Sequence, residues 1–182
     1  MGLTDRLFGR KPKEDAPDPL ADLVLRKLKV GYLVDHDLRT WKVTGYSRYR
    51  FSGLDDDLEE WELTSSDEQR YLERAGDAWS LSRRIAVGDI AGDVRRHIID
   101  HDDPPARIVF EGAEYRLDAS YAGHIFPDGA GAGEPLVRWE FADEAETAFV
   151  GVEQWGETEF TAAAGRVVEE YQFTHILPGS PE

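Results

Sequence analysis

Cysteine is absent from the 182-residue chain, and methionine occurs once. Without cysteine the protein has no disulfide bonds, no thiolate metal ligands and no thiol nucleophile. Long hydrophobic runs are also missing, because no stretch approaches the roughly 18 apolar residues of a membrane-spanning helix. The N-terminus lacks the apolar segment of a secretory signal. These absences predict a cytoplasmic protein, and no cofactor is indicated.

Basic side chains are scarce relative to acidic ones. The chain has 21 Lys and Arg against 37 Asp and Glu, which gives a net charge of −16. Such a charge disfavours nucleic acid as a partner, because its phosphates would be repelled. It favours basic protein surfaces, polyamines or metal ions, although solubility alone also explains an acidic composition. With 41% hydrophobic residues, the composition is that of a globular protein.

The first residues differ from the rest because they are basic. Leu3, Leu7 and Phe8 share one face of a short helical pattern, and Arg10 and Lys11 follow it. A helix of this kind can contact an anionic membrane surface or a groove on a protein partner; a frayed tail is the alternative. Residues 13–19 combine prolines with acids and are expected to be a linker.

From residue 20 onward, apolar and polar residues alternate. Alternation of aromatic and β-branched residues, interrupted by glycine and aspartate clusters, is typical of half-buried antiparallel strands. We therefore expect a mainly β protein, a sandwich or barrel-like domain. The residues expected to form its shared core are Trp41, Trp61, Trp79, Tyr115, Trp139 and Phe173.

Two segments have helical spacing of apolar residues. Residues 20–29 are one, although apolar positions on several faces blur the pattern. Residues 89–100 are the other, with Asp89 as the expected N-cap and Pro104 and Pro105 beyond the end. We interpret the second as a short helix that connects two halves of the chain.

Several short blocks occur twice in the same order. Trp61-Glu62-Leu63 matches Trp139-Glu140-Phe141, and the spacing from Glu73 to Gly76 matches that from Glu153 to Gly156. These matches predict an internal duplication of two antiparallel meanders, with convergent strand patterning as the rival explanation. The expected organisation is a tail and linker at 1–19, a first β repeat at 20–88, a connector with a short helix at 89–104 and a second β repeat at 105–178. The two repeats would form one globular unit.

The motifs also carry a family resemblance. The first half contains G-Y-x-V-D, W-x-V-x-G-Y, E-x-W-E-L and G-D-A-W-S-L, and the second contains E-Y-R-L, W-E-F and V-E-Q-W-G. From about Leu28 to Pro178 the chain resembles the bacterial family catalogued as domain of unknown function 4178. The resemblance brings no catalytic residues. It implies a genomic context of membrane-stress proteins, small membrane proteins and polyamine-synthase-like enzymes.

The repeated glutamates are the first candidate site. Glu62 and Glu140 occupy equivalent positions, as do Glu73 and Glu153. Two carboxylates that meet would raise the pKa of one of them and could bind a cation or perform acid–base chemistry. The alternative is a solvated strand face with ion pairs across the sheet.

Histidines are the second candidate. His97, His101 and Asp102 have the residue types of a metal site, but a helix that ends by Asp100 would separate them. No nucleophile motif or phosphate-binding loop is present. We therefore expect a non-catalytic binding or adaptor protein with a protein partner, and the tail offers a contact with a membrane surface. A small-ligand or cation-binding module (polyamine or divalent metal) between the repeats and a carboxylate-based enzyme are the alternatives.

Overall fold

The structure is a computed structural model and describes residues 23–179. Eleven strands dominate these residues: β1 (Leu33–His36), β2 (Arg39–Phe51), β3 (Leu58–Ser65), β4 (Glu68–Ala75), β5 (Ala78–Ile85), β6 (Arg107–Phe110), β7 (Ala113–Pro127), β8 (Glu134–Ala142), β9 (Ala148–Gln154), β10 (Phe160–Val168) and β11 (Thr174–Leu177). The helical elements are the 3-10 turns η1 (Leu25–Lys27), η2 (Val87–Asp89) and η3 (Glu170–Gln172) and the helix α1 (Val94–His101).

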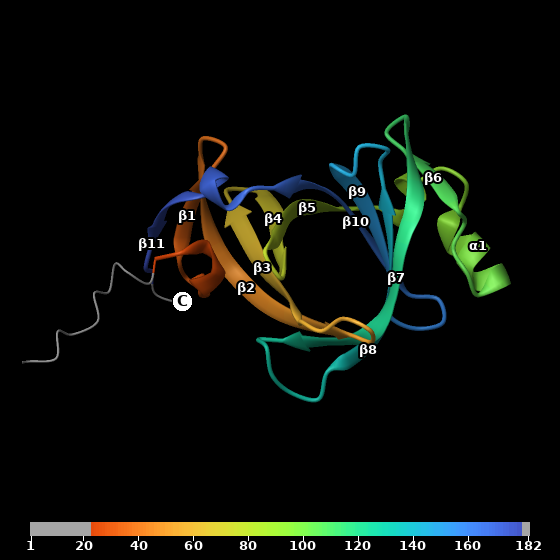
Figure 1. The fold of residues 1–182 in the computed structure, drawn as a ribbon, viewed down its shortest axis with the longest axis horizontal. Helices are drawn as coiled ribbons and strands as arrows, with labels where there is room; N and C mark the ends of the chain where they lie inside the picture. Colours follow the sequence, from red (N-terminus) through yellow and green to blue (C-terminus); the bar gives the residue numbers. More distant parts are fainter. Residues whose placement is uncertain (1–22, 180–182) are drawn as a thin grey trace, which may run out of the picture.

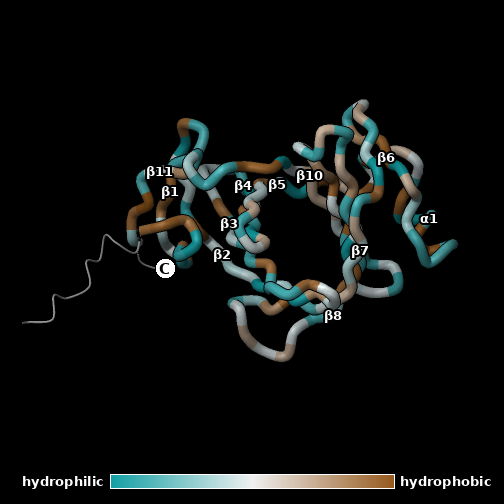
Figure 2. The backbone as a smooth tube through the Cα atoms, in the orientation of Figure 1, coloured by the Kyte–Doolittle hydropathy of each residue, from teal (hydrophilic) through white to brown (hydrophobic). Residues whose placement is uncertain are grey.

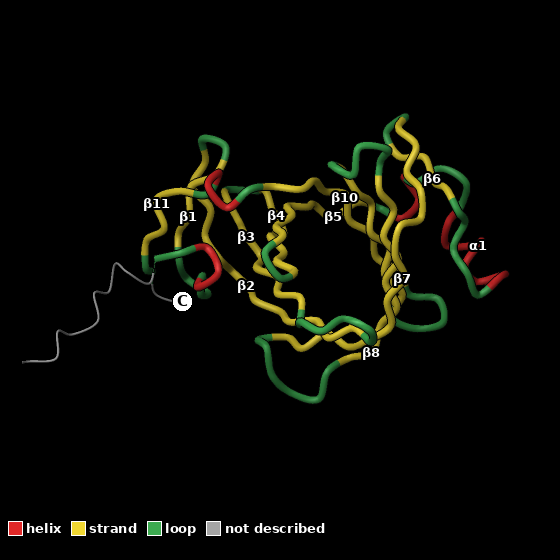
Figure 3. Tube along the Cα trace, viewed as in Figure 1, coloured by secondary structure: helices red, strands yellow, loops and turns green. Residues whose placement is uncertain are grey.

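The strands form a closed antiparallel barrel of eight strands (Figures 1 and 3). Hydrogen bonds link them in the order β2, β3, β4, β5, β10, β9, β8 and β7, and β7 pairs back onto β2. The expected mainly β, barrel-like fold is therefore confirmed. Closure leaves no free strand edge in the barrel wall itself.

The long strands β2 and β7 extend beyond the barrel and carry further strands. The start of β2 pairs with β1, which pairs in turn with β11, whereas the end of β2 pairs with β7. Likewise, the start of β7 pairs with β6. Each long strand also has a register shift against its neighbour, between Val43 and Gly45 in β2 and between Leu117 and Ala119 in β7. The two halves thus use similar pairings; their common origin remains a prediction.

The hydrophobic residues lie mainly outside the barrel wall. One cluster, which includes Trp61 and Trp79, is covered by η1, β1 and the segment leading to β11. A second cluster, which includes Trp139, is covered by α1 and β6. Figure 2 shows hydrophobic residues in both flanking regions. We call the flanks the first lobe (η1, β1 and β11) and the second lobe (η2, α1 and β6).

This arrangement corrects the expectation of one shared core. Five of its six expected members are buried: Trp41, Trp61, Trp79, Trp139 and Phe173; Tyr115 is half-buried. They divide between the two clusters, with Tyr115 packed against the second. The reason is that the two lobes cover the tryptophan faces from outside the barrel wall, so the two sets of tryptophans do not meet. A third, smaller cluster of Tyr49, Phe51, Leu58 and Leu136 joins strands of both halves.

The helices differ from their expected bounds. The connecting helix begins at Val94, and its N-cap is Asp93, whose side chain accepts a hydrogen bond from the Arg96 backbone N–H. Asp89 cannot serve as the cap, because Gly92 and Asp93 both have positive φ and interrupt the helix before Val94. Of the expected helix at 20–29, residues 23–29 contain only the 3-10 turn η1. Within residues 23–179, no helix combines the length and the apolar character needed to cross a membrane.

Candidate functional site

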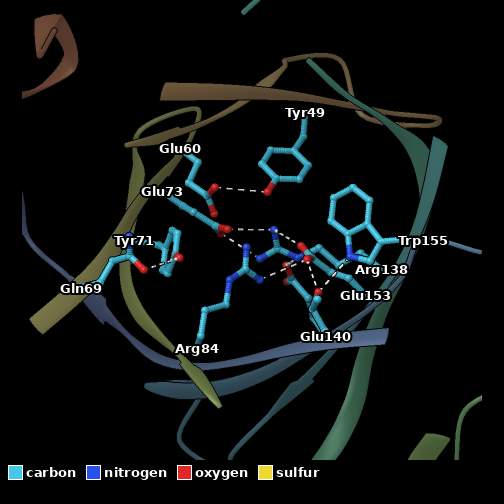
Figure 4. A network of polar contacts seen from close by, with 11 residues as sticks. Tyr49, Glu60, Gln69, Tyr71, Glu73, Arg84, Arg138, Glu140, Glu153 and Trp155 are labelled. Atoms are coloured by element: carbon cyan, nitrogen blue, oxygen red, sulfur yellow. Dashed lines mark hydrogen bonds and ion pairs between the residues drawn. The ribbon is translucent and has the colours of Figure 1, made fainter. Parts of the chain in front are cut away.

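The inner surface of the barrel carries charged side chains. Glu60 and Trp61 are neighbours on β3, so they point to opposite faces of the sheet. Trp61 belongs to the first apolar cluster outside the wall, which leaves Glu60 on the inner face. The same alternation on β8 turns Arg138 inward and Trp139 outward. Figure 4 shows these groups gathered within the ring of strands.

Arg138 is the centre of this network. Its two terminal nitrogens donate hydrogen bonds to the two carboxylate oxygens of Glu73, at 2.9 and 2.8 Å. Its Nε lies 3.0 Å from Glu140 Oε1 without the alignment of a hydrogen bond, and Nη1 lies 3.9 Å from Glu153. Because a buried guanidinium is costly unless it is paired, these carboxylates are what make its burial tolerable.

Arg84 on β5 supplies a second guanidinium. Its Nη1 lies 3.2 Å from Glu153 Oε2, and its guanidinium stacks over the Tyr71 ring at 4.6 Å. The Thr161 hydroxyl donates to the same Glu153 oxygen at 3.0 Å and accepts from Trp155 Nε1 at 2.9 Å. Together with Arg138 on β8, these contacts hold Glu153 with side chains from three other strands.

Glu60 lies in the same interior and has a perturbed pKa. Burial, together with the nearby carboxylates Glu73 and Glu153, raises the pKa of Glu60 to about 8. Its Oε1 lies 3.2 Å from the Tyr49 hydroxyl, and burial also raises the pKa of Tyr49. At pH 7 Glu60 is therefore mostly protonated, which lowers the electrostatic cost of placing several carboxyl groups together.

A cavity of about 340 Å³ opens beside the network. Glu73 and Arg138 in its lining are buried, Glu140 is half-buried, and Asp118 and Glu146 are exposed. Burial raises the pKa of Glu140. Apolar side chains complete the lining, among them Phe51, Leu58, Tyr121 and Phe149. The lining thus combines several carboxylates with apolar and aromatic side chains.

The structure brings three of the four predicted glutamates together. Glu73, Glu140 and Glu153 all lie within ion-pair distance of Arg138. Glu62 does not join them; its carboxylate accepts a hydrogen bond from the Thr44 hydroxyl at 2.7 Å. Glu62 and Glu140 occupy equivalent positions in the sequence, but their carboxylates interact with different partners.

The histidine candidates lie on α1, in the second lobe outside the barrel wall. The helix extends to His101, one residue beyond its expected end, so the rings of His97 and His101 stack with centroids 4.4 Å apart. Asp102 is the C-cap of the helix in a left-handed conformation. Among residues 23–179, no group of three or more His, Asp or Glu side chains is arranged to hold a metal ion. The tail candidates Leu3, Leu7, Phe8, Arg10 and Lys11 lie outside the described residues.

Sequence reasoning did not find Arg138 or Glu60. A usable signal was nevertheless present in the repeated blocks, Glu59–Leu63 and residues 137–141. The residue before the tryptophan is Glu60 in one block and Arg138 in the other, so the sign of the charge reverses at matched positions. Opposite charges at matched inward positions of two halves can pair across an interior.

Comparison with known proteins identifies the family of this chain. The family model described as "Domain of unknown function (DUF4178)" matches residues 29–170. The chain belongs to this family. An "Uncharacterized protein" of Aquifex aeolicus (strain VF5) is 27% identical over 180 residues, which cover 98% of this chain and 99% of the relative. No solved structure matches. The family resemblance expected from the sequence is confirmed.

Proposed function

We propose that the protein is a non-catalytic binding protein whose barrel takes a small organic cation. The observation that carries this proposal is the cavity of about 340 Å³, whose lining has the carboxylates Glu73, Asp118, Glu140 and Glu146 but Arg138 as its one guanidinium. A ligand with one or more ammonium groups would balance the excess of negative charge. Cavities of this size suit small ligands.

The apolar and aromatic residues in the cavity lining favour an organic cation over a bare metal ion. Hard metal ions require several convergent oxygen ligands, whereas Phe51, Tyr121 and Phe149 offer hydrocarbon and ring surface. Aromatic rings attract ammonium groups and also accommodate the methylene chains between them. The sequence analysis expected either a polyamine or a divalent metal as the ligand of a cation-binding module. The cavity lining favours the amine.

A carboxylate-based enzyme is less well supported. Catalysis by a pair of carboxyl groups, as in glycoside hydrolysis, requires both groups to be free on either side of the reacting bond. In the cavity wall, both oxygens of Glu73 accept hydrogen bonds from Arg138, and Glu140 faces the same guanidinium. Glu62 is engaged by Thr44. The carboxylates are thus arranged to hold charge in place, as in a binding site.

The test is a thermal-shift titration with spermidine, agmatine and choline, and separately with Ca²⁺, Mg²⁺ and Zn²⁺. A ligand that binds only the folded state at 100 times its Kd adds about 2.7 kcal/mol of stability, which raises the Tm by several degrees. Glu140→Gln should abolish the shift. Glu62→Gln is the matched control, because Glu62 occupies the equivalent strand position but does not line the cavity. No shift with any amine at millimolar concentration would contradict the proposal.

The adaptor role expected from the sequence remains a second proposal, with a cytoplasmic location and membrane-peripheral contact through the tail. Its support is the basic, amphipathic pattern of residues 1–13. Deleting these residues should leave the melting temperature unchanged and abolish capture on anionic liposomes. Unchanged capture by the shortened chain would remove the tail from this role.

A further inference from the structure

A second depression lies on the outside of the barrel, between the two lobes. We call it the inter-lobe groove; it has a volume of about 570 Å³. Its floor is the seam where β5 pairs with β10, and Figure 1 shows these strands between the flanks that carry β1 and β6. The β1–β2 turn forms part of one wall, and the turn between β6 and β7 forms part of the other. The groove shares only Phe149 with the lining of the barrel cavity that carries the proposed function.

The inter-lobe groove gathers arginines from four different strands. They are Arg39 on β2, Arg70 on β4, Arg83 on β5 and Arg166 on β10. The acidic side chains in the lining are Asp37, Glu68 and Glu111. The lining therefore has a positive balance in a chain whose net charge is −16. Guanidinium groups that are concentrated in one groove of an acidic protein attract anions, which makes the groove a candidate binding site for an anionic ligand.

The four arginines differ in the ion pairs that they already form within the protein. Glu68 forms ion pairs with both Arg39 and Arg70. Arg83 pairs with Glu111 at 2.7 Å and lies over the Phe110 ring at 5.8 Å. Within residues 23–179, Arg166 has no ion-pair partner, and its side chain is exposed. Arg166 is the guanidinium most open to an incoming anion.

Glu111 has the properties of a replaceable partner. Its side chain is 66% exposed and that of Arg83 is 41% exposed, so their ion pair is weak. Glu111 also lies at a turn in a left-handed conformation, which places its carboxylate at the edge of the groove rather than on a strand. An anion with more charge than one carboxylate could displace it from Arg83 and contact Arg166 at the same time.

We propose that the inter-lobe groove binds a small phosphate-bearing anion through Arg83 and Arg166. A phosphate carries up to two negative charges and three acceptor oxygens, and the planar guanidinium group matches its geometry. A monocarboxylate would exchange for Glu111 without any gain in charge. His36 in the same lining adds no positive charge near neutral pH, because burial lowers its pKa. The phosphate can be free or part of an ester of a small molecule.

Isothermal titration with inorganic phosphate and with phenyl phosphate, at constant ionic strength set by chloride, tests this site. Arg166→Gln should weaken binding by about tenfold or more, since a hydrogen bond to a charged group is lost. Glu111→Gln should have the opposite effect and tighten binding by up to about fivefold, because it removes the competing carboxylate. Stronger binding of phenyl phosphate would identify an ester as the ligand; equal binding would identify the free anion.

Arg107→Gln is the matched control, because Arg107 is exposed, pairs with Glu114 and lies outside the groove lining. It should leave phosphate binding unchanged. Melting temperatures without ligand show whether each variant folds, and Arg166→Lys provides a second, charge-preserving variant that should bind at intermediate strength. Equal loss in Arg107→Gln and Arg166→Gln would overturn the site, as would the absence of binding at 10 mM phosphate. Binding of a polyglutamate peptide but not of either phosphate would replace it with a protein-docking surface.

Discussion

Arg138 on β8 forms a two-pronged ion pair with Glu73 on β4, the strand that lies opposite it in the barrel. The strand order places three strands between β4 and β8 in either direction around the wall. The hydrogen bonds of 2.9 and 2.8 Å therefore span the interior rather than linking neighbours along the sheet. The pair joins the two halves of the chain through the middle of the barrel.

This pair predicts a strong dependence of stability on Arg138. Arg138→Met should lower the free energy of unfolding by about 3–5 kcal/mol, because the variant leaves buried carboxylates without their counter-charge. Glu73→Gln should also destabilise, and the double variant should cost at least about 1 kcal/mol less than the sum of the singles. Urea denaturation of the four proteins measures this coupling.

A surface ion pair provides the contrast. Arg96 and Asp100 lie one turn apart on α1, with side chains that are 70% and 44% exposed. Arg96→Gln should change the free energy of unfolding by less than about 0.5 kcal/mol. A loss at Arg138 no greater than the loss at Arg96 would show that the interior network is hydrated and contributes little.

Glu60 predicts a characteristic pH dependence. Its pKa is about 8 in the folded protein against 4.5 in a model peptide, so the folded state holds one more proton between these values. The free energy of unfolding should consequently fall as the pH rises from 4.5 to 8, by at most about 1.4 kcal/mol per pH unit from this group. Glu60→Gln should flatten the profile over that window. Parallel profiles for the two proteins, measured by urea denaturation, would refute the assignment.

The division of the tryptophans between two clusters predicts additivity. Trp61→Leu and Trp139→Leu should each destabilise by several kcal/mol, and their effects should add within about 0.5 kcal/mol because the side chains share no neighbours. By contrast, Trp61 and Trp79 stack with centroids 5.7 Å apart. Their double variant should deviate from additivity. Strong coupling between Trp61 and Trp139 would favour a single shared core.

Two glycines lie where the two halves of the barrel pair with each other, Gly123 at the β2–β7 pairing and Gly165 at the β5–β10 pairing. Neither position has room for a side chain. A Cβ on Gly123 would lie 2.1 Å from the Arg50 carbonyl oxygen, and one on Gly165 would lie 2.7 Å from the Ser82 Cβ. Gly123→Ala and Gly165→Ala should each lower stability by about 1–3 kcal/mol or more through overpacking. Gly88→Ala is the control, because a Cβ there meets nothing within 4 Å. Thermal denaturation of the three variants makes the comparison.

The sequence was informative about strands and much less so about the orientation of their faces. Alternation separates Trp61 from Glu60 and Glu62, but the same alternation is compatible with either face pointing inward. Burial of the tryptophan face suggested a common centre. The lobes cover that face from outside instead. The first lobe depends on the long-range pairing of β1 with β11, and the second on the packing of α1 against the cluster of Trp139; no local pattern encodes either contact.

The candidate site was predicted in part for a similar reason. Glu73, Glu140 and Glu153 stood out because they recur at matched positions, and the structure brings them to Arg138. Arg138 itself looks like any polar residue on a solvated strand face. Only closure of the barrel turns that face into an interior, so its partners on β4 and β9 could be identified only once the strand order was known.

The first lobe has a practical consequence for where the folding unit begins and ends. Residues 29–170 define the family match, yet Leu25, Leu28 and Phe173 lie beyond these limits and are at most 6% exposed. The Leu28 carbonyl also accepts a hydrogen bond of 3.0 Å from the indole N–H of Trp61. A chain cut at the family boundaries would bare one side of the barrel and leave an indole without its acceptor. The recognisable part of the sequence is therefore shorter than the part that must be kept for the protein to be stable.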